Sequence, residues 1–175
     1  MEITRYGVIL RQLTEHKIEM IRNWRNDPKI VQYMEYKEYI TPEMQKKWFD
    51  KINNNNNYYF IILVENKEIG LINIRDIDYK LSEGEAGIYI YDESKLNSTI
   101  SFQATFALYD FCFEELRLER VIAHILKNNK RAIKYNKLIG YKLSDLQENI
   151  DNQHYVLSKN DYFNTRNEFS SLLMI

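Results

Sequence analysis

The chain has 175 residues, a formal net charge of −1 and 45% hydrophobic residues, which indicates one domain spanning residues 1–175 with a core large enough to need no disulfides. The near-zero charge and the absence of a Lys/Arg run argue against DNA or RNA as a partner. The sequence has no signal-peptide pattern and no stretch of about 18 consecutive apolar residues, so we expect a cytoplasmic protein with no membrane partner.

Cysteine and histidine give no sign of a metal site. The single cysteine, Cys112, lies in an apolar helical pattern, where a buried thiol acting as a small hydrophobe is expected. The three histidines are scattered, and none stands at a metal-ligand spacing from another His, Asp or Glu. His124 alternates with Val121, Ala123 and Ile125, so we expect a packed strand histidine. The sequence predicts neither a disulfide nor a metal ion.

The first half of the chain predicts two helices followed by a strand hairpin. After a short strand at residues 8–13, Thr14 is the expected N-cap of a helix that ends at Asp-Pro (27–28), because the residue before proline is disfavoured in helical conformation. The sequence TPE at 41–43 begins a second helix with a cap, a proline at the first position and an acid at the positive end of the dipole. Two apolar runs then predict a hairpin of strands 58–64 and 68–74.

Residues 84–141 carry the pattern around which the rest of the chain is organised. They read as a strand (EAGIYIY), a polar turn (DESKLNSTIS), a helix over 102–116, a second strand (RVIAHIL) and a short helix closed by Gly140. Apolar residues alternate in the strands and recur every three to four residues in the helices, which predicts a βαβα unit with a parallel strand pair. With further strands at 141–147 and 154–160, the chain predicts an α/β fold with a mixed sheet.

The sequence does not determine what two of its segments pack against. The helix over 102–116 is apolar around most of its surface, so the sheet and other helices cover it, or a second copy does so in a homodimer. The tail 163–175 ends in SLLMI, which either docks on the fold or extends from it.

The order of these elements resembles the GNAT superfamily of acetyl-CoA-dependent N-acetyltransferases over nearly the whole chain. The resemblance rests on GEAGIYI, on LERVIAHILKNNKRAIKYNKLIGY, and on RNWRNDPKIVQYM and TPEMQKKWFDKI near the start. WRND and TPEMQKKWFDKI are similar to the branch that holds amino-sugar-nucleotide acetyltransferases of the pseudaminic-acid type and acetyltransferases of ribosomal-protein N-termini. The resemblance implies a mixed, mostly antiparallel sheet with a central splayed parallel strand pair and flanking helices, and acetyl-CoA as co-substrate.

The same resemblance implies where the cofactor binds. The pantetheine arm would lie along the backbone of Ile88 and Ile90, in the gap between the splayed strands. Asn129 would contact pantetheine, cap its helix, or do both. Arg131 would reach the 3′-phosphate or remain solvated, and Asn136 would donate a hydrogen bond to the cofactor.

The phosphate-binding turn departs from the family pattern. In relatives this turn carries two glycines, and here those positions fall on Thr99 and Ser101 in one register or on Ser98 and Ile100 in the other. Either this turn has lost the cofactor, or its amides still point inward and the hydroxyls add donors. A left-handed conformation at a non-glycine residue would cost about 1–2 kcal/mol.

Acetyl transfer to an amine needs a base for the amine proton, donors for the oxyanion and an acid for the thiolate. Glu85 matches the glutamate that relatives place on this strand as the base, acting through water, and the alternative is an edge carboxylate on a solvated turn. The position at which many relatives carry the acid, a tyrosine, is Asn136 here, next to Tyr135. The thiolate therefore leaves to water, or Tyr89 protonates it.

The segment around 24–39 would cover the acceptor, with Arg25, Asn26, Met34 and Tyr36 as candidate substrate residues. Aromatic rings stack on sugars and bases, and an arginine pairs with a phosphate, which favours an amino-sugar nucleotide as the acceptor. For Trp24 a place in the core is the more natural interpretation. The alternatives are N-acetylation of a protein N-terminus or other small amine, or a non-catalytic GNAT-like binding protein.

Overall fold

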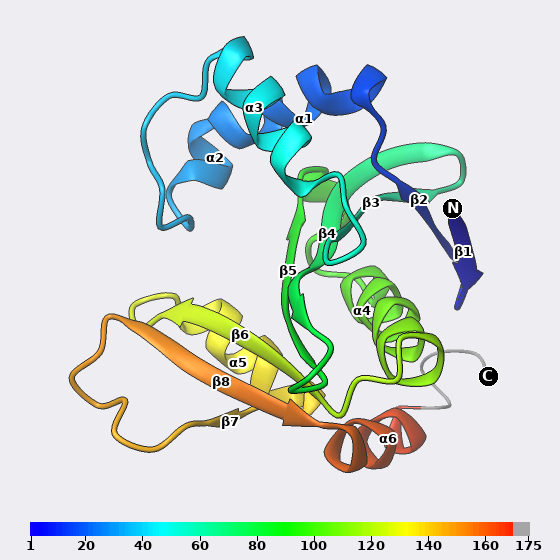
Figure 1. Cartoon of the computed structure of the whole chain (residues 1–175), viewed down its shortest axis with the longest axis vertical. Helices are drawn as coiled ribbons and strands as arrows, with labels where there is room; N and C mark the ends of the chain where they lie inside the picture. The colour runs from blue at the N-terminus through cyan, green and yellow to red at the C-terminus, as the bar shows by residue number, and fades with distance from the viewer. Residues whose placement is uncertain (170–175) are drawn as a thin grey trace.

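An eight-stranded sheet forms the centre of the molecule in the computed structural model, which describes residues 1–169 (Figure 1). The strand order is β1-β2-β3-β4-β5-β6-β8-β7, and all neighbours are antiparallel except β5 and β6. The strands are β1 (Glu2–Arg5), β2 (Val8–Gln12), β3 (Tyr58–Val64), β4 (Lys67–Asp78), β5 (Glu83–Ile90), β6 (Arg120–Leu126), β7 (Lys142–Leu143) and β8 (Asn152–Ser158). The predicted mixed sheet with one parallel pair is confirmed.

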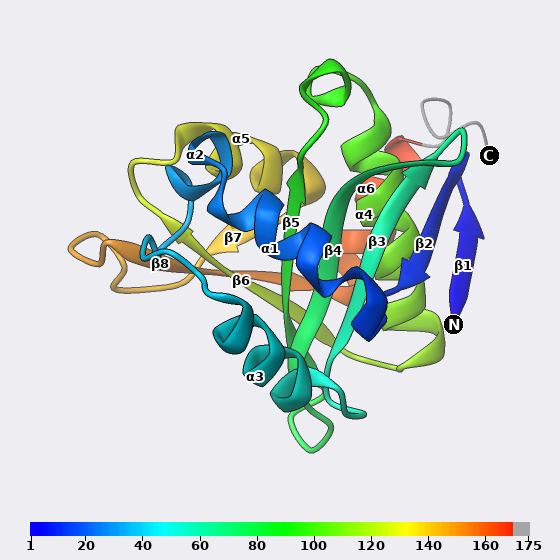
Figure 2. The ribbon, with the colours of Figure 1, turned by 90° about the horizontal axis from the view of Figure 1, so that it is seen from above.

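Helices cover both faces of this sheet, as Figure 2 shows from above. One face carries α1 (Ile18–Asn26), α2 (Pro28–Val31) and α3 (Pro42–Ile52), and the other carries α4 (Ile100–Asp110), α5 (Lys130–Ile139) and α6 (Lys159–Glu168). Each face has its own hydrophobic core, the larger one around α4 and the smaller one around α1 and α3. No helix within residues 1–169 is long and apolar enough to cross a bilayer.

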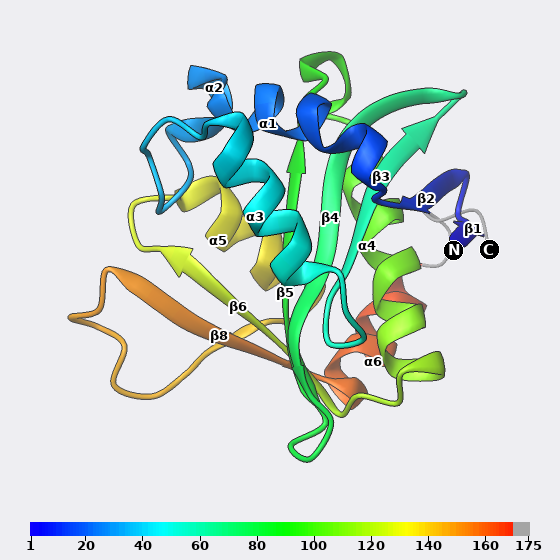
Figure 3. The same ribbon diagram turned by 45° about the horizontal axis from the view of Figure 1, so that its top comes forward.

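The parallel pair separates part-way along its length, and this separation positions the site. The ladder between β5 and β6 pairs Glu83 with Arg120, Gly84 with Val121 and Glu85 with Ile122, and it ends there. Beyond this point β5 continues alongside β4 as far as Ile90, whereas β6 continues alongside β8, so the two strands diverge (Figure 3). Within residues 1–169, the β6-facing edge of β5 after Glu85 therefore has no strand partner.

Local capping explains most helix boundaries. The Thr41 side chain accepts from the Met44 amide at 3.3 Å and confirms the predicted start of α3. The predicted cap at Thr14 is wrong, because its side chain makes no capping bond and a 3₁₀ turn at Glu15–Lys17 precedes α1. Gly140 ends α5 in the left-handed region with φ 107°, a conformation that glycine adopts without a Cβ penalty.

The sequence missed three elements and misjudged a fourth. β1, the single turn α2, and α6 were not predicted, and the predicted strand over 141–147 is only the two-residue β7. In α6 only Tyr162 is buried among polar residues, so the segment shows little helical periodicity. The Ser158 side chain caps it by accepting from the Asp161 amide at 3.1 Å. The predicted SLLMI ending lies outside the described residues.

The apolar helix is covered by its own chain. Every residue of α4 from Ala104 to Asp110 is buried, and the helix packs against β1, β2 and β4. A π-helical turn at Phe111–Glu115 follows and contains Cys112, which is fully buried, as predicted, and whose pKa is raised by burial. Of the two ways to cover this helix, the structure therefore shows the sheet and helices of the same chain.

Candidate active site

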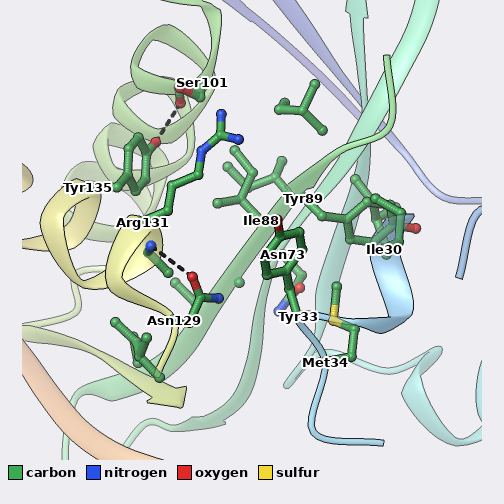
Figure 4. Close-up of a pocket in the computed structure, with 18 of the residues that line it drawn as sticks. Ile30, Tyr33, Met34, Asn73, Ile88, Tyr89, Ser101, Asn129, Arg131 and Tyr135 are labelled. Carbon is green, nitrogen blue, oxygen red and sulfur yellow. Dashed lines mark hydrogen bonds between the residues drawn. The ribbon is translucent and has the colours of Figure 1, made fainter. Parts of the chain in front are cut away.

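An open cleft of about 1320 Å³ lies where β5 and β6 diverge. Its lining comes from both separated strands, from the turn before α4, from the first turns of α5, and from α1 and the segment after it. Figure 4 shows Arg131, Asn129 and Tyr135 on one side and Tyr33 and Met34 on the other, with β5 between them. The site therefore has two compartments that meet at β5.

On the first side, the open strand edge and the turn before α4 form a surface for an extended anionic ligand. Ile88 and Ile90 line the cleft on the part of β5 that has no β6 partner. Ser98 and Ser101 line it too, whereas Thr99 and Ile100 do not. Of the predicted turn residues, the structure thus brings two to the cleft.

The turn that lacks glycine is unstrained. None of residues 92–101 has a positive φ, so no left-handed conformation is imposed on a residue with a Cβ. The Ser98 hydroxyl donates to the Lys95 carbonyl at 2.6 Å and accepts from the Ile100 amide at 3.3 Å. The next two amides, those of Ser101 and Phe102, lie in the first helical turn, where amides have no intrahelical acceptor. Although the turn lacks glycine, the amides of Ser101 and Phe102 at the positive end of α4 therefore have no acceptor within residues 1–169.

Helix α5 closes this side through contacts with the turn. Asn129 caps the helix by accepting from the Ala132 amide at 3.1 Å and also lines the cleft. Arg131 Nη2 donates to the Leu96 carbonyl at 2.8 Å. The Asn136 side chain lines the cleft while donating to the Ala132 carbonyl at 2.9 Å. The start of α5 is therefore tied to the turn, with one cation held at their junction.

Tyr135 does not stand free in the cleft. Its hydroxyl donates to the Ser101 carbonyl at 2.8 Å and lies 2.7 Å from Thr105 Oγ1, and burial raises its pKa (Figure 4). The side chain thus links α5 to α4.

Glu85 lies at the end of the parallel ladder, where the strands begin to part. Its side chain is 16% exposed, and Oε1 accepts from Arg75 Nη2 at 2.6 Å. The same oxygen lies 3.3 Å from His124 Nδ1 on β6. The prediction of a packed His124 is wrong: Val121, Ala123 and Ile125 are buried on one face, and His124 is 36% exposed on the cleft face.

The second compartment contains buried donors with no partner. Arg25 Nη1, Gln45 Nε2, Asn73 Nδ2 and the Tyr89 hydroxyl are the buried side-chain polar atoms without a hydrogen bond in residues 1–169, and all four residues line the cleft. Burial lowers the pKa of Arg25, and the charge interaction with Tyr89 partly offsets this decrease. Burial raises the pKa of Tyr89. Since such groups are costly unless satisfied, their concentration in one cleft marks a binding site for acceptor atoms.

Gly87 makes room for one of these donors. It pairs with Asn73 across β4 and β5, and a Cβ at Gly87 would lie 3.1 Å from Asn73 Oδ1. Sequence reasoning missed Asn73 and Gln45 because neither belongs to a recognisable motif. The facing of a polar residue and a glycine in adjacent strands could have drawn attention to Asn73.

The candidate substrate residues are divided by the fold. Arg25, Met34 and Tyr36 line the cleft. Asn26 does not, because its amide binds the backbone of Ile40 in both directions, at 2.9 and 2.8 Å. Trp24 is buried, as expected, and stacks on Tyr91 with ring centroids 4.9 Å apart.

The cleft carries more positive than negative side chains. Glu85 is already paired with Arg75. The cationic lining residues are Arg25, Lys29, Arg75, Arg131 and Lys134, and the acidic ones are Glu35, Glu85 and Glu93. This balance favours anionic ligands over cationic ones.

The splayed parallel pair, the helix N-terminus facing the gap and the cation-rich cleft define an acyl-CoA-dependent transferase fold. The chain belongs to the GNAT acetyltransferase family, because the family model "Acetyltransferase (GNAT) domain" matches residues 8–142. The fold class predicted from the sequence is confirmed.

Three known proteins are similar to this chain. Acetyltransferase PseH of Campylobacter jejuni subsp. jejuni serotype O:23/36 (strain 81-176) is 28% identical over 151 residues, which cover 86% of this chain and 91% of PseH. Apo FdhC, a nucleotide-linked sugar GNAT, is 22% identical with a TM-score of 0.82, over 99% of this chain and 98% of FdhC. The spermidine N-acetyltransferase from Vibrio cholerae in complex with CoA and spermine is 20% identical with a TM-score of 0.72, over 90% and 98% of the two chains.

Membership of this family makes the protein an acetyl-CoA-dependent N-acetyltransferase. The residues of the first compartment fit that co-substrate. The unpaired edge of β5 offers backbone groups to an amide-containing arm, and the first amides of α4 together with Arg131 offer donors to phosphates.

Proposed function

We propose that this N-acetyltransferase acts on the amino group of a nucleotide-linked amino sugar. The observation that carries the proposal is Arg25, a half-buried cation whose Nη1 is itself buried and has no partner within residues 1–169. A buried charge without a counterion is costly, so a protein keeps one where a ligand supplies the opposite charge. A phosphate of the acceptor is the natural partner, because the planar guanidinium donates two hydrogen bonds to it.

The neighbouring groups support an acceptor rich in hydrogen-bond acceptors. Asn73 Nδ2, Gln45 Nε2 and the Tyr89 hydroxyl all present unused donor capacity, and sugar hydroxyls and carbonyl oxygens can accept from them. The exposed rings of Tyr33 and Tyr36 on the same lining offer faces for a base or sugar. The names of PseH and FdhC, an acetyltransferase and a nucleotide-linked sugar GNAT, agree with this choice.

A polyamine is the competing acceptor that the structural neighbours bring forward. A polycation needs unpaired carboxylates, but here five cationic side chains line the cleft against three acidic ones. Glu85, the acid nearest the strand separation, is already held by Arg75 at 2.6 Å. The electrostatics therefore disfavour spermidine.

In the proposed reaction the amine attacks directly, with both substrates bound. Acetyl-CoA, when bound, supplies the thioester carbonyl that becomes the new amide. Glu85 accepts the proton of the amine through a water molecule, and the cleft residues around Arg25 orient the acceptor. The Tyr89 hydroxyl serves as a hydrogen-bond donor. Because burial raises the pKa of Tyr89, the hydroxyl keeps its proton, and the coenzyme A thiolate leaves without taking it.

An acetylation screen tests the proposal. The panel contains nucleotide-linked amino sugars, the same amino sugars without the nucleotide, spermidine and a peptide with a free N-terminus. We expect a nucleotide-linked sugar to exceed its free counterpart in kcat/KM by at least tenfold, roughly 1.4 kcal/mol for the phosphate contact. A preference for spermidine or the peptide, or equal rates with and without the nucleotide, would contradict the proposal.

A further inference from the structure

Two neighbouring histidine side chains extend from Glu85 across the sheet. His124 on β6 stands directly opposite His154 on β8, so both side chains project from the same face. Their ring centroids are 5.1 Å apart, and His154 Nδ1 lies 2.7 Å from Ser144 Oγ. At the other end, His124 Nδ1 lies 3.3 Å from Glu85 Oε1. The two histidines therefore join the cleft to the outer strands of the sheet.

The contact between Glu85 and His124 has the form in which a carboxyl group orients an imidazole and can exchange a proton with it. The two residues come from the strands that part at this point, and the ladder ends at Glu85. The His124 side chain is 36% exposed and lines the cleft, so its ring can exchange a proton with solvent. Glu85, at 16% exposure, has less direct access to water.

The charged groups around His124 are largely paired with one another. On β4 and β5, Arg75 binds Glu85 at 2.6 Å, and Glu83 binds Arg120 of β6 at 2.9 Å. From the segment after α2, Glu35 Oε2 accepts from Asn152 of β8 at 3.1 Å.

On β8, burial lowers the pKa of His154, and neighbouring His124 lowers it further. The neutral form of His154 is therefore favoured beside the ring of His124.

We propose that His124 is a proton acceptor in acetyl transfer: it takes from Glu85 the proton removed from the acceptor amine and releases it to solvent. The proton moves from the amine nitrogen to Glu85 through water, and from the Glu85 carboxyl to the unprotonated Nδ1 of neutral His124, whose Nε2 carries the hydrogen. The resulting imidazolium releases one proton to bulk water, and proton exchange with solvent returns the ring to the tautomer with a bare Nδ1. Glu85 is thereby restored for the next turnover. His154, whose Nδ1 lies 2.7 Å from Ser144 Oγ, packs beside the His124 ring and limits its movement. This inference rests on the proposed function, since it assigns a route to the proton of that reaction.

A packing role is the alternative, because two histidines facing each other across antiparallel strands can simply fill the surface of the sheet. The two roles differ in chemistry. If His124 only packs, an added base should not restore the activity lost on its removal. If His124 accepts a proton, a small base that enters the vacated space can take its place and restore activity.

The experiment compares His124→Ala and His124→Gln with the wild type, using the best amine from the acetylation screen. We expect kcat to fall by about 100-fold in both variants, in the range for a lost acid–base group, with acetyl-CoA affinity and Tm close to the wild-type values. Added imidazole should restore part of the kcat of His124→Ala, increasingly so as pH rises and more of the imidazole is neutral. His16→Ala, in the 3₁₀ turn before α1 and away from the cleft, is the matched control and should keep wild-type kcat.

Two results would overturn the inference and leave the proposed function standing: full activity of His124→Ala, or a loss of activity that imidazole does not restore. A wild-type protein that acetylates no amine in the panel would overturn the proposed function and the inference together. Rescue of His124→Ala by imidazole, with no rescue of His16→Ala beyond the wild-type response, supports the assigned role.

Discussion

Arg25 on α1 and Tyr89 on β5 influence each other's pKa, yet Arg25 Nη1 and the Tyr89 hydroxyl have no hydrogen-bond partner within residues 1–169. Both are buried, and both line the cleft. The protein therefore keeps two unsatisfied donors in one cleft, at a cost to its own stability, where acceptor oxygens of a ligand would satisfy them. Binding and stability should respond in opposite directions when either group is removed.

Arg25→Met tests this opposition. The substitution removes a buried N–H donor, Arg25 Nη1, that has no partner within residues 1–169, so the free energy of unfolding should rise by about 1 kcal/mol. It also removes the proposed phosphate contact, so KM for the nucleotide-linked acceptor should rise roughly 10- to 100-fold, with acetyl-CoA affinity unchanged. Arg11→Met, at a site paired with Glu2 on the β1–β2 edge, serves as control and should alter neither quantity appreciably. Urea unfolding and steady-state kinetics measure the two effects, and an unchanged KM would remove Arg25 from acceptor binding.

Tyr89→Phe separates a hydrogen-bond donor from a proton donor. Because burial raises the pKa of Tyr89, the hydroxyl should keep its proton throughout the working pH range. We expect kcat to fall by about 10- to 100-fold, with the pH–rate profile keeping its shape and the protein as stable as before or more so. Loss of the alkaline limb of the profile in this variant would instead identify Tyr89 as the acid that protonates the thiolate.

Arg131→Gln tests the first compartment. The guanidinium bonds the Leu96 carbonyl at 2.8 Å and lines the cleft beside the start of α4, so its loss removes a phosphate donor and loosens the turn. We expect the Kd for acetyl-CoA, measured by calorimetry, to rise about tenfold. Lys130→Gln, one residue earlier with an exposed side chain outside the cleft lining, is the matched control. Equal effects of the two substitutions would show that only the net charge matters.

Asp110→Asn tests how α4 is anchored. The carboxylate is 1% exposed, with Oδ1 2.6 Å from both the Tyr162 hydroxyl and Arg166 Nη1, and Oδ2 3.0 Å from Arg5 Nη1. It thus ties the end of α4 to β1 and α6, and neutralising it leaves two arginines without their buried partner.

We expect the Asp110→Asn variant to lose about 3–5 kcal/mol of unfolding free energy in urea. Glu115→Gln, whose side chain is 55% exposed, should change it by less than about 0.5 kcal/mol. Similar values for the two variants would mean that the Asp110 cluster does not stabilise the fold.

The sequence carries the framework of this fold because periodicity and turn residues are local signals. The alternation in EAGIYIY and RVIAHIL, with an apolar helix between them, is enough to predict the parallel pair formed by β5 and β6. Helix α6 was not predicted because Tyr162 is its one buried side chain and the residues around it are mostly polar. Its helical state depends on tertiary contacts of Tyr162 and Arg166 with Asp110, which no sequence window contains.

The candidate site likewise contains residues that the sequence identified and residues that it missed. Arg25, Glu85 and Ser101 stand in motifs of the family, and the structure places them on the cleft. Asn73 and His124 could not be identified by motif, since each gains its meaning from a residue in the neighbouring strand: Gly87 for Asn73 and Glu85 for His124. Polar residues facing each other across strands that separate are a signal only once the register is known.

Tyr59 predicts how stability changes at alkaline pH. The side chain is half-buried on β3, its ring centroid lies 5.1 Å from that of Trp48 in an edge-on arrangement, and burial raises the pKa of Tyr59 to about 12. An unfolded tyrosine ionises near pH 10, so above that value the unfolded state loses its proton before the folded state does. The stability linked to Tyr59 is fully present below pH 10 and is lost as pH rises toward 12, by about 2 kcal/mol in all. Urea unfolding at pH 9, 10 and 11 should show a smaller decline in Tyr59→Phe than in the wild type. Identical declines in the two proteins would show that Tyr59 ionises equally readily in both states.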